Sequence, residues 1–144
     1  GVCFSYGTWF GIEGLLAVGE PPDSRRVKRA ARFLLSRQHA DGGWGESHRA
    51  SVEKRWVDDP VSRPVQTAWA LLALMAADDP ARGLVQRQAI DRAVQLLCRS
   101  QREDGGWQQD TIVGVFNRNC MITYDNNRYL MPTWALARYT ARYT

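Results

Sequence analysis

Histidine and cysteine are scarce in this sequence, which contains two histidines and three cysteines. The histidines, His39 and His48, stand in other segments than Cys3, Cys98 and Cys120, and no Cys-x-x-Cys pair occurs. A zinc site built from cysteine and histidine is therefore not expected. An odd number of cysteines without a disulfide framework predicts reduced thiols in an intracellular chain.

Long apolar runs and long basic blocks are also missing. No stretch reaches the length that crosses a bilayer. The first residues carry neither an initiator methionine nor a charged leader. We therefore expect the sequence to begin at an internal position of a longer protein and not with a signal peptide.

The formal net charge is +4, and the basic residues are densest at 25–32. On a helix they lie mostly opposite the apolar stripe, which predicts a solvated outer face. Attraction to anionic lipid headgroups is the alternative. Nucleic acid is not an expected partner, because no aromatic residues are interleaved with this charge.

One motif occurs twice: the stretches 38–44 and 101–107 both read Gln-x-x-Asp-Gly-Gly-Trp. A similar segment precedes each copy, with apolar residues spaced i, i+3, i+4 and i+7 as in an amphipathic helix. These residues are Val27, Ala30, Ala31 and Leu34 in the first segment and Ile90, Ala93, Val94 and Leu97 in the second. The recurrence predicts a structural repeat.

Each motif is expected to end its helix and turn the chain back. Gln38 and Gln101 continue the apolar stripes, and the Asp-Gly-Gly that follows them stops the helix. Trp44 and Trp107 can then fold over the glutamines, whose amides can stack on the indoles and still bond to backbone groups.

A second kind of segment alternates with the first. The stretches 7–19, 66–80 and 131–143 each place a tryptophan early in an expected helix. Residues 68–77 are apolar on every side, which predicts burial all round. Pro132 suits the first turn of the last helix.

The resulting order is buried helix, amphipathic helix, Gly-Trp turn and loop, repeated. This order predicts an all-α fold, a sector of an α/α toroid with alternating inner and outer helices, in a single domain spanning 1–144. About two and a half such units are present. Because repeat units bury their faces against neighbours, the ring is expected to be incomplete.

The paired Gln-to-Trp turns resemble the QW repeats of the squalene and oxidosqualene cyclases. The flanking blocks GVCFSYGTWFGIEGL (1–15) and GVFNRNCMITYDNNRYLMPTWALARY (114–139) resemble the C-terminal region of the oxidosqualene cyclases, the lanosterol and cycloartenol synthase branch. The resemblance covers the whole chain. The squalene–hopene branch is the less similar alternative.

The resemblance implies an enzyme that cyclises 2,3-oxidosqualene. An aspartic acid protonates the epoxide, and rings then close in a cationic cascade within a dry cavity whose aromatic faces stabilise the cations. No cofactor or metal is implied. The family also implies one-sided, peripheral attachment to an intracellular membrane.

Carried over by position, Phe116 matches a family aromatic that faces the later cations, and Tyr6 and Tyr124 match cavity tyrosines. Cys120 and Ile122 fall at neighbouring lining positions. Packing at helix ends is the alternative for each of these five.

The resemblance gives the QW residues a structural role, in which they brace the outer helices. They are Gln38, Gly42, Trp44, Gln101, Gly105 and Trp107.

The sequence also departs from the family pattern. Asn127 stands where an aromatic is usual, and Tyr129 stands where asparagine is usual, so the end of the cavity is expected to differ in shape. The family's Asp-Cys-Thr-Ala-Glu segment with the catalytic acid has no counterpart here. We therefore expect this chain alone not to cyclise substrate, and the remainder of a cyclase chain to be its partner.

Other chemistry has weaker support. The Asp-Asp-Pro stretches at 58–60 and 78–80 lack the third carboxylate of a magnesium–diphosphate site and are expected at turns and helix ends. Glu13 is expected to bond to a neighbouring helix end, with a buried acid as the alternative. Cys98 is expected in the core. A prenyltransferase-like zinc site is not expected, because no histidine stands near a cysteine. A non-catalytic α/α module that binds a partner remains an alternative function.

Overall fold

In the computed structural model, residues 3–79, 87–108, 111–117 and 119–144 are described. Their elements follow the order α1 (Cys3–Ala17), α2 (Arg25–Leu35), α3 (Arg49–Glu53), α4 (Pro64–Ala77), α5 (Arg87–Arg99), β1 (Gly114–Phe116), β2 (Cys120–Ile122) and α6 (Asn127–Tyr143). Helices dominate, which confirms the all-α class.

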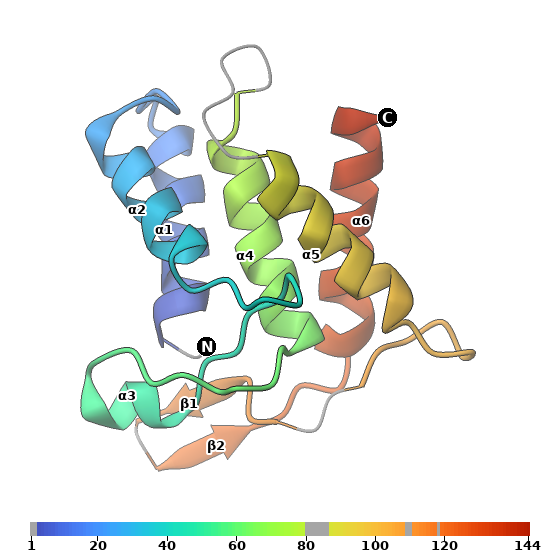
Figure 1. Cartoon of the computed structure of the whole chain (residues 1–144). Helices are drawn as coiled ribbons and strands as arrows, with labels where there is room; N and C mark the ends of the chain where they lie inside the picture. Colours follow the sequence, from blue (N-terminus) through green and yellow to red (C-terminus); the bar gives the residue numbers. More distant parts are fainter. Residues whose placement is uncertain (1–2, 80–86, 109–110, 118) are drawn as a thin grey trace.

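The helices form two layers (Figure 1). In the first layer α4 packs between α1 and α6, and the three helices run in the same direction. In the second layer α2 packs on α1 and α4, while α5 packs on α4 and α6, both in the opposite direction. Inner and outer helices thus alternate along the chain, as the repeat predicts, and closure into a toroid stays a prediction.

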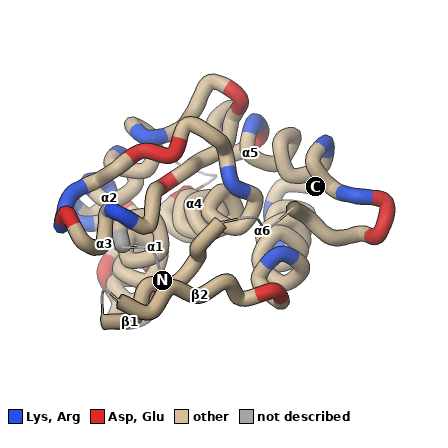
Figure 2. The backbone as a smooth tube through the Cα atoms, turned by 90° about the horizontal axis from the view of Figure 1, so that it is seen from below, with Lys and Arg blue, Asp and Glu red and all other residues tan. Residues whose placement is uncertain are grey.

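Burial of α4 explains its central place. The helix contains no charged residue, begins with Pro64 in its first turn, and buries every residue from Val65 to Met75. Seen along the inner helices, charged residues are spread over the surrounding elements and leave α4 free of them (Figure 2). The predicted burial of 68–77 is confirmed except at Ala76, which is partly exposed.

The outer helices are amphipathic, as predicted. The side chain of Ser24 caps α2 by accepting a hydrogen bond from the amide of Val27. Val27, Ala31 and Leu34 are buried against the inner layer. Four of the five basic residues within 25–32 are exposed and the fifth is partly exposed, so this group does form a solvated face.

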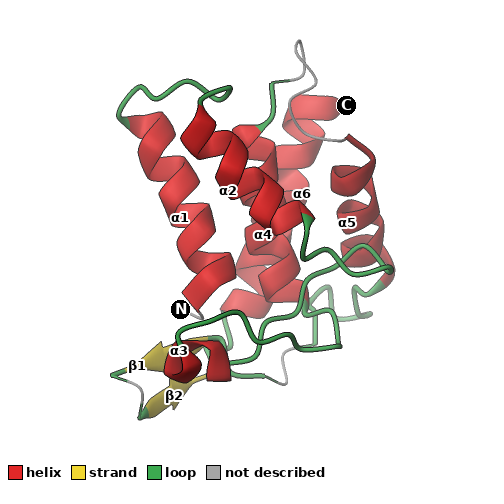
Figure 3. Cartoon of the chain, turned by 60° about the vertical axis from the view of Figure 1, so that its left-hand side comes forward, coloured by secondary structure: helices red, strands yellow, loops and turns green. Residues whose placement is uncertain are grey.

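A short helix and a hairpin cover one end of the layers (Figure 3). α3 and the antiparallel pair β1–β2 lie at the end where α1, α4 and α6 begin. The hairpin places Gly114 opposite Ile122 and Phe116 opposite Cys120. This small sheet was not predicted.

Several local expectations need correction. The outer helices end at Leu35 and Arg99, before their glutamines, so Asp-Gly-Gly shapes the following turn and does not stop the helix. Pro132 lies inside α6, because the helix begins at Asn127. Cys98 is exposed and not in the core, because it falls on the outward side of α5.

Asp78 directly follows α4, as expected of a helix-end residue. Within the described residues, no helix combines the length and apolar character of a membrane span.

Candidate functional site

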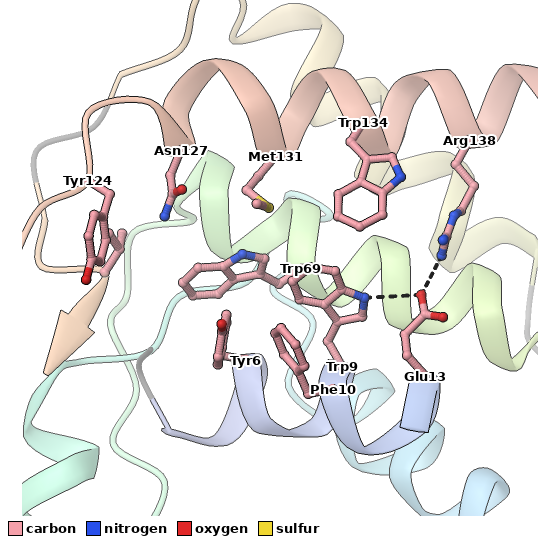
Figure 4. A pocket seen from close by; sticks show the side chains of 11 residues that line it. Tyr6, Trp9, Phe10, Glu13, Trp69, Tyr124, Asn127, Met131, Trp134 and Arg138 are labelled. Atoms are coloured by element: carbon pink, nitrogen blue, oxygen red, sulfur yellow. Dashed lines mark hydrogen bonds and ion pairs between the residues drawn. The ribbon is translucent and has the colours of Figure 1, made fainter. Parts of the chain in front are cut away.

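An aromatic pocket lies on the inner layer of helices (Figure 4). Its volume is about 630 Å³, and α1 and α6 flank it while α4 lies behind it. Its lining residues are Tyr6, Trp9, Phe10, Glu13, Trp69, Val113, Tyr124, Asn127, Met131, Trp134 and Arg138.

Five of these aromatic rings form a connected group, those of Tyr6, Trp9, Phe10, Trp69 and Trp134. The ring of Tyr6 lies 5.0 Å from that of Trp69 and 4.5 Å from that of Phe10, measured between centroids. Trp9 meets Trp134 at 5.5 Å with an interplanar angle of 73°. Tilted and edge-on contacts hold each ring without stacking its two faces against other rings. Ring faces attract cations, so this group could stabilise positive charge in a bound molecule.

One end of the pocket is polar. Arg138 of α6 donates to Glu13 Oε1 of α1 at 2.6 Å, and Trp9 Nε1 donates to the same oxygen at 3.3 Å. The guanidinium of Arg138 also lies 5.4 Å from the ring centroid of Trp134. The partner of Glu13 is thus a side chain and not the helix end that the sequence predicted. These contacts connect α1 to α6 across the face of α4.

The structure divides the five predicted lining residues into two groups. Tyr6 and Tyr124 line the pocket. Phe116, Cys120 and Ile122 lie together in the hairpin, where Phe116 is 64% exposed and Ile122 is partly exposed.

Sequence reasoning assigned no site role to most of the pocket. Trp9, Phe10 and Glu13 follow Tyr6 at helical spacing, and Trp69 and Trp134 recur at the matching place of the next two inner helices. Three aligned tryptophans on inner helices were the signal that could have located this wall.

The first QW turn joins α2 to α5. Gln38 Nε2 donates to the carbonyl oxygens of Gly42 and Ala89, at 2.9 and 2.8 Å, and Arg92 donates to Gln38 Oε1 at 2.6 Å. The buried indole of Trp44 donates to the carbonyl of Leu34 at 2.8 Å. The glutamine therefore connects its own turn to the start of the next outer helix.

The second QW turn repeats the local bonds only. Gln101 Nε2 donates to the carbonyl of Gly105 at 2.8 Å, and Trp107 Nε1 donates to that of Leu97 at the same distance. Trp107 is buried, but Gln101 is exposed. The two turns thus share their internal geometry and differ in whether an outer helix packs against them.

The described segments contain no group of three or more His, Cys, Asp or Glu residues that could hold a metal ion.

Two carboxyl groups at or near the first QW turn have pKa values shifted from their ordinary values. Burial raises the pKa of Glu46 more than its hydrogen bonds from Phe4 and Ser5 lower it. At Asp41 burial also raises the pKa, but hydrogen bonds from Gly43 and Ser62 and nearby positive charge leave it lowered.

These features define a class: an all-α domain of alternating helices with tryptophan-closed turns and an aromatic pocket on its inner layer. Residues 1–141 match the family model of the squalene-hopene cyclase C-terminal domain, and the chain belongs to this family.

Similar proteins include the lanosterol synthase of Homo sapiens, 42% identical over 147 residues, and the cycloartenol synthase of Dictyostelium discoideum, 49% identical over 143 residues. The lanosterol synthase of Saccharomyces cerevisiae is 42% identical over 144 residues. Each alignment covers 99% of this chain but only 19%, 20% and 19% of the respective relative. The chain thus corresponds to a small part of each relative.

Proposed function

We propose that the protein carrying this chain is an oxidosqualene cyclase, an isomerase that converts 2,3-oxidosqualene to a polycyclic triterpenoid such as lanosterol or cycloartenol. The observation that carries the proposal is the aromatic pocket, which lies in a chain of the cyclase family. A carbocation cascade needs a site that excludes water and stabilises positive charge without a nucleophile, and aromatic side chains meet both needs.

In this proposal the described residues form part of the cavity wall. Tyr6 and Trp69 present aromatic rings from α1 and α4, and Tyr124 presents another from the segment before α6. Phe116, Cys120 and Ile122 extend the wall along the hairpin, where exposed positions can meet substrate or other parts of a longer chain.

The QW residues supply bracing. The buried indoles of Trp44 and Trp107 each hold a carbonyl at the end of an outer helix. Gln38 extends this bracing to α5, which supports the assignment of Gln38, Gly42 and Trp44, with Gln101, Gly105 and Trp107 as their repeat.

The proton donor is assigned to another part of the protein. Glu13 is the one carboxyl group among the described residues that line the pocket, and it is engaged by Arg138 and Trp9. We therefore assign Glu13 to the wall and expect the acid on the remainder of the cyclase chain.

Peripheral, one-sided attachment to an intracellular membrane is part of the same proposal. A substrate as apolar as oxidosqualene partitions into lipid, so an enzyme that takes it up benefits from contact with the bilayer. Flotation of the full-length protein with liposomes tests this point. Protein that stays at the bottom of the gradient at every lipid composition contradicts it.

The activity is tested by incubating the purified full-length protein with 2,3-oxidosqualene and, separately, with squalene, followed by gas chromatography and mass spectrometry. We expect cyclised product from oxidosqualene and none from the 144-residue chain alone. Product from squalene instead would favour a squalene–hopene-type cyclase. No product from either substrate would contradict the enzyme and favour a non-catalytic α/α module.

A further inference from the structure

Glu46 is a fully buried carboxylate next to the first QW turn. It follows Trp44 and Gly45 in the chain, and its side chain has no accessible surface. Within the described part of the chain, no lysine or arginine forms an ion pair with it. A buried charge without a cation is costly unless hydrogen bonds compensate for the lost water.

Hydrogen bonds from the first turn of α1 offset part of this cost. Glu46 Oε1 accepts from the amide of Phe4 at 3.0 Å, and Oε2 accepts from both the amide and the hydroxyl of Ser5 at 2.8 Å. The first amides of a helix have no partner within the helix and carry partial positive charge. Glu46 therefore caps α1 from a segment more than forty residues away.

The backbone of the same residue is held by the first turn of α4. Gln66 Nε2 donates to the carbonyl of Glu46 at 2.9 Å, and the amide of Glu46 donates to Gln66 Oε1 at 2.5 Å. The neighbouring amide of Trp44 donates to Thr67 Oγ1 at 3.1 Å. Glu46 thus contacts the beginnings of two inner helices. Its side chain bonds to α1, and its backbone bonds to α4.

These two helix turns lead directly into the pocket. Ser5 precedes Tyr6, and Gln66 lies one turn before Trp69 on the same helix. Tyr6 and Trp69 are the rings that meet at 5.0 Å. We propose that Glu46 is a positioning residue that sets the placement of Tyr6 against Trp69 and thereby the shape of the aromatic wall. Its consequence for catalysis rests on the proposed cyclase function.

The test uses four variants of the full-length protein. Glu46→Gln keeps the shape but turns a donor toward the amides of α1, and Glu46→Asp keeps the carboxylate on a shorter side chain. Ser5→Ala removes the hydroxyl bond and leaves both amide bonds, so it is the mild variant if Glu46→Gln does not fold. Glu20→Gln is the matched control, because Glu20 pairs with Arg26 away from the pocket.

The first readout is hydrogen exchange at the amides of residues 4–6, compared with amides in the middle of α4. We expect Glu46→Gln to speed exchange at residues 4–6 by about tenfold or more, Ser5→Ala to speed it less, and both to leave the α4 amides unchanged. Unchanged exchange at residues 4–6 in both variants would overturn the proposal.

The second readout is turnover of 2,3-oxidosqualene. We expect Glu46→Gln to lower kcat about tenfold with little change in KM and to release incompletely cyclised products, with partial recovery in Glu46→Asp. A loss of kcat that only follows the loss of folded protein, with unchanged products, would reduce Glu46 to a purely structural residue and overturn the proposal. If the wild-type protein does not turn over oxidosqualene, only the proposed cyclase function is contradicted. The exchange data still decide whether Glu46 holds the first turn of α1 in position.

Discussion

Gly42 lies directly against the backbone of Arg92: a Cβ atom on this glycine would come within 2.6 Å of the Arg92 carbonyl oxygen. At the corresponding glycine of the second turn, Gly105, no atom of the described residues beyond its two chain neighbours lies within 4 Å of that position. Both glycines adopt positive φ angles, +96° and +80°. The two turns therefore have the same backbone shape, but only the first is wedged against an outer helix.

This difference predicts unequal effects of the same substitution. Gly42→Ala and Gly105→Ala both place a side chain in a left-handed conformation, which costs about 1–2 kcal/mol. Gly42→Ala must also push α5 away, so we expect its loss of unfolding free energy to exceed that of Gly105→Ala by about 1–3 kcal/mol. Denaturant unfolding of both variants measures the difference. Equal losses would mean that the first turn is not wedged against α5.

The tryptophans of the two turns are expected to contribute alike. Trp44 and Trp107 are buried, and each indole bonds to a carbonyl at the end of its outer helix. Truncation to alanine leaves a large cavity and removes the indole bond, although Leu34 O still accepts from the Arg37 amide and Leu97 O from the Ser100 hydroxyl. Because the cavity dominates, each substitution should lower the unfolding free energy by about 3–5 kcal/mol.

Trp134→Ala is the control for that comparison, because Trp134 is 40% exposed. It should cost clearly less than either QW variant in the same denaturant titration. Melting curves of the Trp44 and Trp107 variants that match the wild type would contradict the bracing role.

The parts of the fold that sequence reasoning predicted are those governed by local periodicity. The stripe from Val27 to Leu34 needs only one buried side, and the apolar segment of α4 can only be central. The bond from each QW glutamine to a backbone carbonyl follows from the tight turn itself. These features depend on residues close together in the chain.

The parts that were missed depend on distant contacts. Glu13 and Arg138 meet across 125 residues, and each alone is an ordinary charged residue on a helix. Glu46 is buried although glutamate is usually exposed, because two helix turns supply its bonds. The hairpin has strands of three residues, too short for an alternating pattern to be recognised.

The pKa of Glu46 predicts a specific dependence of stability on pH. Burial raises this pKa above the ordinary value of 4.5, against the opposing hydrogen bonds from Phe4 and Ser5. The folded state therefore holds this proton at pH values where the unfolded state has lost it. The contribution of Glu46 to the unfolding free energy falls as the pH rises from 4.5 to the raised folded pKa and is level above it.

Glu46→Gln should remove that decline. We expect the difference in unfolding free energy between wild type and variant to change over this pH interval and to be constant above it, in urea titrations from about pH 4 to about pH 8. Taking differences also removes the opposite contribution of Asp41, whose lowered pKa makes its stabilisation disappear as the pH falls. A flat difference curve for Glu46→Gln would contradict a raised pKa.

Phe116 offers a way to separate packing from substrate contact. Phe116 is 64% exposed in β1, so removal of its ring leaves no cavity in the described structure. Phe116→Ala should change the unfolding free energy of the 144-residue chain by less than about 0.5 kcal/mol. If the protein is a cyclase, as proposed, and Phe116 faces the later cations of its cascade, the same variant of the full-length protein should alter the product mixture, since the cations lose an aromatic face. Phe116→Tyr should retain most of the original mixture.

Met121→Ala is the control, because Met121 is 48% exposed in the paired strand and is not a predicted lining residue. An unchanged product mixture in Phe116→Ala would assign the ring to the protein surface, and a large loss of stability would assign it to packing.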